Sequence, residues 1–218
     1  MKNIIFIIIK ELFGFIFRLF GLLYLIEIVN KNDTLFYVFN YHSFSKYNNF
    51  KIKRGSILET GYKDNFEKQI KFYKKHFHFS YPDEFFENSN NSHSAFITFD
   101  DGYKDNHDLA LPILQKYDAK AIFFIVTSLT GSNDMLMHDK IRWLVQIGEL
   151  ESKYLNIPNN INKGVNEYSE TVTNHINKIF NKVKTKKRLL LNEREIKTIS
   201  KNGFKIGVHT HNHKPLLF

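Results

Sequence analysis

Short apolar runs alternate with segments of helical periodicity through most of the chain. Residues 95–99 (AFITF) and 121–126 (AIFFIV) are continuous apolar runs, typical of strands that are buried on both faces of a parallel sheet. Residues 106–117 between them predict a helix, which gives a right-handed βαβ unit. Two more strands are predicted, at residues 35–42 and 204–208. The pattern therefore predicts an α/β fold built on a parallel sheet.

Helical signals accompany these strands. Apolar residues recur at helical spacing over residues 65–77. Asn192 is followed three residues later by Glu195, which resembles a capping box at the start of a helix. The periodicity of residues 128–190 is weaker, and we predict a single helix there, around residues 141–150.

Residues 1–30 are far more apolar than the rest of the chain, although charged residues interrupt them. At 100° per residue the polar residues fall on one narrow stripe, a pattern typical of a helix that lies in a membrane interface. A tilted spanning anchor and a buried helix of the globular domain are the alternatives. The first alanine is Ala95, so no small-residue cleavage site for a signal peptide is found near the start. We predict a membrane-associating helix over residues 1–30 and a globular domain over residues 34–218.

The composition excludes several classes of protein. The 218 residues include no cysteine, which excludes a disulfide scaffold, a cysteine nucleophile and a thiolate metal site. Hydrophobic residues make up 43% of the chain and charged residues 24%, which is ordinary for a globular protein. The formal net charge of +9 suits an anionic surface. The alternative is that it reflects biased codon usage in a chain rich in Lys, Asn and Ile. No nucleic-acid recognition motif accompanies this charge, so a nucleic-acid partner is not predicted.

Candidate catalytic residues follow three of the predicted strands. They are His42, the pair Asp100 and Asp101, and the pair His209 and His213. The carboxyl ends of parallel strands share one edge of a sheet, where ligand sites gather. One carboxylate and two imidazoles suit a divalent cation that activates water, and a second carboxylate beside them suits a general base. A turn or a surface histidine cluster would explain either motif alone, but their joint position favours a catalytic site.

Two of these motifs resemble those of the polysaccharide deacetylases, the NodB-homology family. Residues 98–102 (TFDDG) are identical to the T-F-D-D-G motif of that family, and residues 209–213 (HTHNH) fit its H-[ST]-x-x-H motif. The resemblance implies a deformed, incomplete (β/α) barrel, preceded by the N-terminal apolar helix. It also implies a metal-dependent hydrolase that removes N-acetyl groups from an N-acetylhexosamine polymer.

The resemblance carries roles to individual residues. Asp100 looks like the catalytic base of the family, and Asp101, His209 and His213 look like its metal ligands. Zn²⁺ is the expected cation, with Co²⁺, Mn²⁺ and Ni²⁺ as alternatives. The implied partner is an N-acetylated polysaccharide of the cell envelope or an exopolysaccharide. The expected location is the cell envelope, associated with the membrane or on its outer face.

A second, narrower resemblance lies before the first loop. Residues 40–42 (NYH) look like the N-terminal Y-H element of the exopolysaccharide branch, which includes the poly-N-acetylglucosamine deacetylases. In that branch the histidine is similar in role to a catalytic acid, which makes His42 the candidate acid. A structural role for His42 is the alternative.

One family feature is missing from the sequence. Family members continue past the histidine loop into an R/P-Y-type motif whose arginine orients the base, whereas the chain ends at Phe218. We therefore expect an incomplete barrel with weak turnover, and the alternative function is a catalytically impaired, metal-binding and membrane-associated fragment. The histidines that match no family motif are expected to be surface or structural residues: His76, His78, His93, His107, His138 and His175.

Overall fold

The computed structural model of the chain describes residues 35–45, 59–87, 93–156, 168–183 and 188–214. The helix predicted over residues 1–30 lies outside the described residues. Within the described ranges, no helix is both long and apolar enough to cross a membrane.

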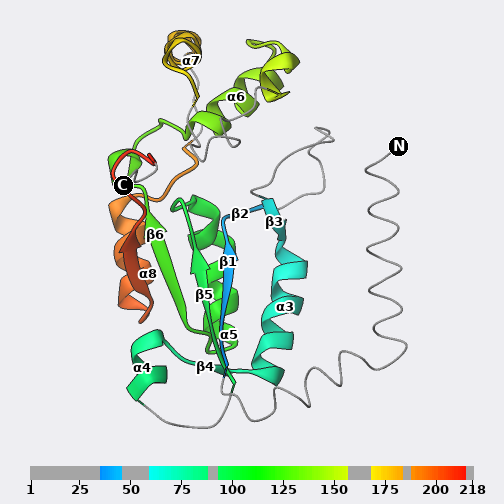
Figure 1. The fold of residues 1–218 in the computed structure, drawn as a ribbon, viewed down its shortest axis with the longest axis vertical. Helices are drawn as coiled ribbons and strands as arrows, with labels where there is room; N and C mark the ends of the chain where they lie inside the picture. The colour runs from blue at the N-terminus through cyan, green and yellow to red at the C-terminus, as the bar shows by residue number, and fades with distance from the viewer. Residues whose placement is uncertain (1–34, 46–58, 88–92, 157–167, 184–187, 215–218) are drawn as a thin grey trace, which may run out of the picture.

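A parallel sheet lies at the centre of the described structure (Figure 1). Its main strands, in spatial order, are β1 (Phe36–Tyr41), β5 (Ser94–Phe99), β6 (Ala121–Ile125) and β7 (Lys205–Val208), and the short β4 (His78–Phe79) also pairs with β5. Every pairing in this sheet is parallel. The predicted α/β fold with a parallel sheet is confirmed, and each main strand begins and ends within one residue of its predicted bounds.

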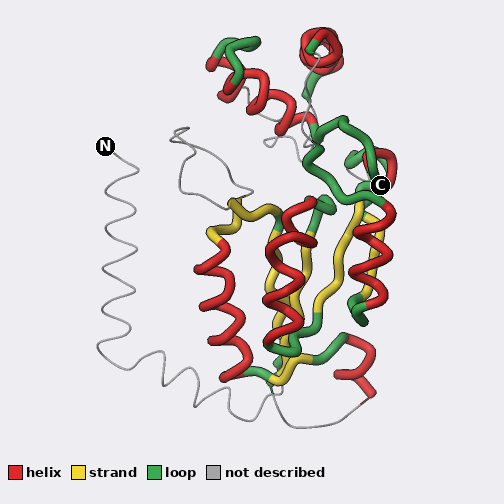
Figure 2. The backbone as a smooth tube through the Cα atoms, turned by 180° about the vertical axis from the view of Figure 1, so that it is seen from behind, coloured by secondary structure: helices red, strands yellow, loops and turns green. Residues whose placement is uncertain are grey.

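Three helices cover one face of the sheet (Figure 2): α3 (Lys63–His76), α5 (Leu111–Lys116) and α8 (Glu193–Lys201). Helix α5 continues from a π-helical turn, η2 (Asn106–Ala110), so the helix predicted between β5 and β6 is present with an irregular start. Helix α8 begins with the predicted capping box of Asn192 and Glu195. A separate pair of short parallel strands follows β1: β2 (Ser43–Ser45) and β3 (Glu59–Tyr62).

The main hydrophobic core lies between the sheet and these helices. Ile97, Phe99 and Phe123 on the strands are fully buried, and the rings of Phe99 and Phe123 stack with their centroids 4.7 Å apart. Phe66 and Ile70 of α3 pack into the same cluster. Burying a side chain of this size contributes about 1.5–3 kcal/mol. The core thus fixes the strands whose ends carry the candidate catalytic residues.

Two further helices, α6 (Met137–Gln146) and α7 (Glu170–Lys182), lie beyond the carboxyl ends of the strands (Figure 1). Leu144, Ile176 and Phe180 are almost fully buried in their shared core. Helix α7 was not predicted, because most of its residues are polar and the partner of its apolar stripe is distant in sequence. The remaining short helices are α4 (Pro82–Glu87), η3 (Thr127–Leu129) and η4 (Ser152–Asn156).

Candidate active site

The two adjacent aspartates follow β5 in a turn with left-handed backbone. Asp101 has φ of 71° and Gly102 has φ of 70°, a region that glycine enters at little cost. A Cβ at Gly102 would lie only 3.1 Å from the Cδ1 atom of Ile125. The two carboxylates differ in exposure: the side chain of Asp101 is 2% exposed, whereas that of Asp100 is 20% exposed. The two groups therefore occupy different environments.

The histidine loop follows β7 and curls back toward this turn. The backbone N–H of His209 donates to the carbonyl of Ile125 at 2.8 Å, which fixes the start of the loop against β6. Thr210 and His213 have positive φ values of 61° and 56°, which is uncommon for residues other than glycine. The rings of His209 and His213 lie close together, with their centroids 5.3 Å apart.

Asp101, His209 and His213 come together in the arrangement of a metal centre. The Nε2 atoms of His213 and His209 lie 3.0 Å and 3.5 Å from Oδ1 of Asp101, and all three ligand atoms lie within 4.8 Å of one another. Two donors bound at about 2.1 Å to one tetrahedral cation lie roughly 3.4 Å apart. Oδ1 is buried and accepts no hydrogen bond from the described residues. Because the donor atoms converge without satisfying one another, they fit a small divalent cation.

The charges at this centre favour an ionised carboxylate. Burial alone would raise the pKa of Asp101, but the adjacent His213, helped by His138 and His42, lowers that pKa below its ordinary value. Contact with Asp101 in turn raises the pKa of His213. Metal ligands must be deprotonated to bind, so a proton on His213 competes with a cation for this site.

His42, at the end of β1, lies beside Asp100. Its Nε2 atom is 3.8 Å from Oδ2 of Asp100, and both side chains are about one-fifth exposed. The side chain of Asn106 donates to the carbonyl of His42 at 2.6 Å, and Oδ2 of Asp105 accepts from the Ser43 hydroxyl at 2.6 Å. The segment after the aspartate turn therefore holds the loop that carries His42. All five candidate residues predicted from the sequence meet at one edge of the sheet.

A buried polar cluster next to His213 was not predicted. Nε2 of His138 lies 2.9 Å from the Tyr103 hydroxyl, which donates to Asp139 at 2.9 Å. The rings of His138 and His213 have centroids 6.2 Å apart. Burial is the main cause that lowers the pKa of His138. The sequence predicted only a surface or structural role for His138. It could not place His138 beside the candidate site, because this residue matches no motif and comes from a distant segment of the chain.

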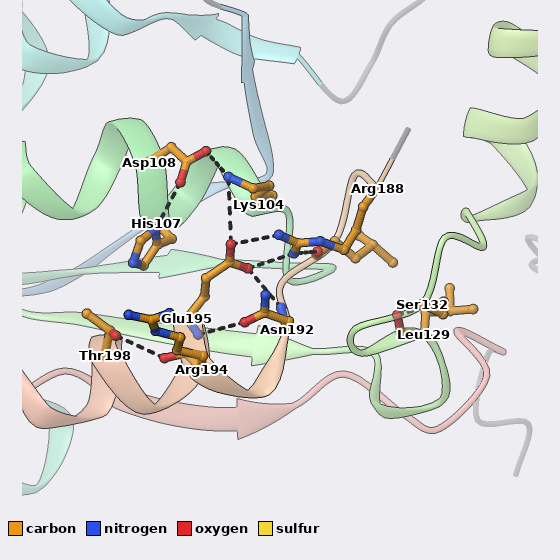
Figure 3. Close-up of polar contacts among 11 residues, drawn as sticks. Lys104, His107, Asp108, Leu129, Ser132, Arg188, Asn192, Arg194, Glu195 and Thr198 are labelled. Atoms are coloured by element: carbon orange, nitrogen blue, oxygen red, sulfur yellow. Dashed lines mark hydrogen bonds and ion pairs between the residues drawn. The ribbon is translucent and has the colours of Figure 1, made fainter. Parts of the chain in front are cut away.

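A second group of histidine and carboxylate side chains lies near the site, but cations already pair with its carboxylates. Candidate ligand atoms of His107, Asp108 and Glu195 lie within 4.8 Å of one another. Lys104 contacts Asp108 and lies 3.6 Å from Glu195, while Arg188 binds both oxygens of Glu195 at 2.7 Å and 2.8 Å (Figure 3). This group is an ion-pair network that ties the segment after the aspartate turn to the start of α8.

A comparison with protein families identifies the chain. The family model for polysaccharide deacetylases matches residues 87–218, which is more than half of the sequence. The chain belongs to the polysaccharide deacetylase family. The resemblance drawn from residues 98–102 and 209–213 is therefore confirmed.

Individual relatives of this deacetylase-family chain are distant. YxkH of Bacillus subtilis (strain 168), which carries the name of a polysaccharide deacetylase, is 28% identical over 122 residues, covering 52% of this chain and 43% of YxkH. Among solved structures, the Streptococcus pyogenes deacetylase PplD in complex with acetate is 21% identical with a TM-score of 0.46, covering 81% of this chain and 56% of PplD. IcaB from Ammonifex degensii is 15% identical with a TM-score of 0.38, and the match covers 84% of this chain and 88% of IcaB. The chain thus spans less than two thirds of YxkH and of PplD.

Proposed function

We propose that this chain is a metal-dependent hydrolase that removes N-acetyl groups from N-acetylhexosamine residues of a polysaccharide. The observation that carries the proposal is the convergence of Asp101, His209 and His213 on one point, with Asp100 and His42 beside them. Membership of the polysaccharide deacetylase family supports the class of reaction.

The donor set supports the choice of cation. Two imidazoles and one carboxylate suit Zn²⁺ first, with Co²⁺, Mn²⁺ and Ni²⁺ as alternatives. Such a cation, held by Asp101, His209 and His213, supplies a Lewis acid for the acetamide carbonyl and lowers the pKa of a water molecule.

The chain's own residues move the protons. Asp100 is partly exposed and next to the candidate metal ligands, where its carboxylate can accept a proton from the attacking water. His42, whose Nε2 lies 3.8 Å from Asp100, then donates a proton to the departing amine. This second transfer matters because an amine leaves poorly without a proton.

We also propose that the sheet forms part of a deformed (β/α) barrel domain over residues 34–218. Helices α3, α5 and α8 lie on one face of the parallel sheet, as the outer helices of such barrels do (Figure 2). On the opposite face, the side chain of Val38 is 53% exposed.

The substrate and location follow from the same hypothesis. We propose a cell-envelope polysaccharide or an exopolysaccharide as the substrate, and residues 1–30 as the part of the chain that associates with the membrane. Residues 1–30 would then hold the enzyme at the membrane, close to a substrate of the cell envelope.

An acetate-release assay on N-acetylglucosamine oligomers tests the proposed function. The full chain with Zn²⁺ should release acetate, and a chelator should abolish the release. Asp100→Asn should lower the rate by about 10²-fold or more, in line with the typical contribution of a positioned base. His211→Ala is the matched control, because His211 belongs to the same loop but its Nδ1 contacts Thr127 instead of Asp101. Zn²⁺ binding without any acetate release would contradict the proposal and favour a catalytically impaired metal-binding fragment.

A further inference from the structure

Asn40 makes a hydrogen bond to the candidate base that no motif predicted. Its Nδ2 atom donates to Oδ2 of Asp100 at 3.0 Å. Thr98 in turn donates from its hydroxyl to Oδ1 of Asn40 at 2.9 Å. The register of the sheet explains this chain of contacts, because Asn40 on β1 pairs with Thr98 on β5, so both side chains stand on the same face.

The direction of both hydrogen bonds is fixed by chemistry. An ionised carboxylate only accepts hydrogen bonds, so the amide NH₂ of Asn40 must face Asp100 and its oxygen must face Thr98. Thr98 is only 7% exposed, and its hydroxyl donates to Oδ1 of Asn40. Asn40 itself is exposed, and Thr98 is the contact that holds its amide in the orientation that suits Asp100.

A purely structural role does not account for this contact. The backbone N–H of Asp100 already donates to the carbonyl of Tyr41 at 2.9 Å, and β1 pairs with β5 along its whole length. The two strands are therefore joined without the side chain of Asn40. The contact does determine which oxygen of Asp100 is engaged: Oδ2 accepts from Asn40 and faces His42, while none of the described residues donates to Oδ1.

We propose that Asn40, oriented by Thr98, is a positioning residue for Asp100: it holds Oδ2 and presents Oδ1 to the attacking water. This inference rests on the proposed function, in which Asp100 is the base. It assigns a task to a side chain two residues before His42 and to the threonine of the TFDDG segment.

A measurement without metal or substrate tests the contact itself. In the ¹⁵N-labelled full chain, the side-chain amide resonance of Asn40 is identified by its loss in Asn40→Ala. Asp100→Ala and Thr98→Val should each shift this resonance and speed up exchange of its protons with water by about 10-fold, as expected when one hydrogen bond is lost. Val38→Ala is the matched control, because Val38 is an exposed residue of β1 whose side chain stands on the same face. A resonance that does not respond to Asp100→Ala would overturn the proposal.

Kinetics then test the positioning role. Asn40→Ala should lower kcat for acetate release by about 10- to 100-fold, as expected for loss of a hydrogen bond to a charged group. KM should stay within about two-fold, because the effect falls on the chemical step. The affinity for Zn²⁺ alone should also be unchanged. Thr98→Val should act in the same direction, and Thr98→Ser, which keeps the hydroxyl, should restore the rate.

The same variants separate positioning from general damage. In an Asp100→Asn background, Asn40→Ala should change the residual rate by less than about two-fold, since residues that act through one another are not additive. Full additivity of the two substitutions would overturn the inference. If the unaltered chain releases no acetate, the proposed function fails, whereas the amide resonance still decides whether Asn40 holds Asp100.

Discussion

Asp100 and Asp101 are adjacent in sequence, yet their side chains meet different surroundings. The left-handed backbone at Asp101 sends its carboxylate inward, where it is 2% exposed and faces the imidazoles of His209 and His213. Asp100 remains 20% exposed and faces His42. Two identical side chains are thus suited to two tasks, one to hold a cation and one to accept a proton from a water molecule.

The proposed metal centre can be tested by exchanging one aspartate at a time. Asp101→Asn should weaken Zn²⁺ binding by more than about 100-fold, because it removes a ligand, and loss of a mere supporting contact already costs 10- to 100-fold. Asp100→Asn should leave Zn²⁺ binding within a few-fold of the original. A competition titration with a chromophoric chelator measures both. Equal loss of affinity in the two variants would contradict the division of labour.

The partly buried carboxyl of Asp105 should give the stability of the fold a pH dependence. Burial raises the pKa of Asp105 to about 7, although hydrogen bonds from Ser43 and from the backbone of Phe44 oppose the shift. The charges of Asp108 and Asp139 raise it further. Because the folded state holds this proton more tightly than the unfolded state, its stabilising effect is complete below about pH 4 and is lost as the pH rises to about 7.

Asp105→Asn should remove this dependence, since the amide does not titrate. Between pH 4 and pH 8 the free energy of unfolding of the original chain should fall relative to that of the variant, by up to about 4 kcal/mol for a shift of three pKa units. Urea unfolding of both proteins at several pH values measures the difference. Parallel curves for the two proteins would show that Asp105 is not the group responsible.

The site residues predicted from sequence are those that belong to motifs with fixed spacing. His42, Asp100, Asp101, His209 and His213 all follow strands, and the sheet brings them to one edge. The contacts of Asn40 and His138 were not predictable in this way. Both depend on which side chains a distant strand or helix places opposite them, and no spacing along the chain encodes that.

At the scale of elements, the predicted parts are those with strong local patterns. The four main strands are apolar runs, and α8 has a capping box, so each signal is contained in a few consecutive residues. Helix α7 shows the opposite case, because its stability depends on packing Ile176 and Phe180 against α6. A polar helix with a narrow apolar stripe gives little signal until its partner is known.

The contact between β6 and β7 depends on the absence of a side chain at Gly207. A Cβ at this position would lie 2.5 Å and 2.6 Å from ring atoms of Phe124 on β6. Gly207→Ala should therefore lower the free energy of unfolding by about 1–3 kcal/mol, as overpacking typically does. It should also weaken Zn²⁺ binding, because β7 leads directly into His209. Thermal and urea unfolding measure the first effect.

Two further variants make the Gly207 experiment specific. Val208→Ala is the control on the same strand, since Val208 is 67% exposed and its loss should change stability by less than about 0.5 kcal/mol. Adding Phe124→Leu to Gly207→Ala should recover part of the loss, because the smaller side chain makes room for the new methyl group. If Gly207→Ala does not lower the free energy of unfolding, then β6 and β7 can accommodate the new methyl group, and the prediction is wrong.

On the scale of the whole molecule, the fold collects the candidate site at the carboxyl edge of the sheet and places its main core between the sheet and the helices that cover one face. The ion-pair network of Lys104, Arg188 and Glu195 joins the aspartate turn to α8, which leads through β7 to the histidine loop. Backbone bonds from Lys104 to Leu189 and from Leu191 to Gly102 support the same junction. The two halves of the site, about 100 residues apart in sequence, are thus held by one continuous set of contacts.

Residues 1–30 provide the last test, which concerns the proposed association of the whole chain with a membrane. This segment contains three basic and two acidic residues, so a chain without it keeps a formal net charge of +8. Binding driven by charge alone should survive the deletion, whereas binding by an apolar interfacial helix should be lost. We expect the full chain to sediment with anionic vesicles and the shortened chain to remain in solution. The shortened chain should still show a cooperative melt. Neutral phosphatidylcholine vesicles serve as the control for binding that is driven by charge. Equal binding by both proteins would rule out the anchor, and aggregation of the shortened chain would instead make residues 1–30 part of the core.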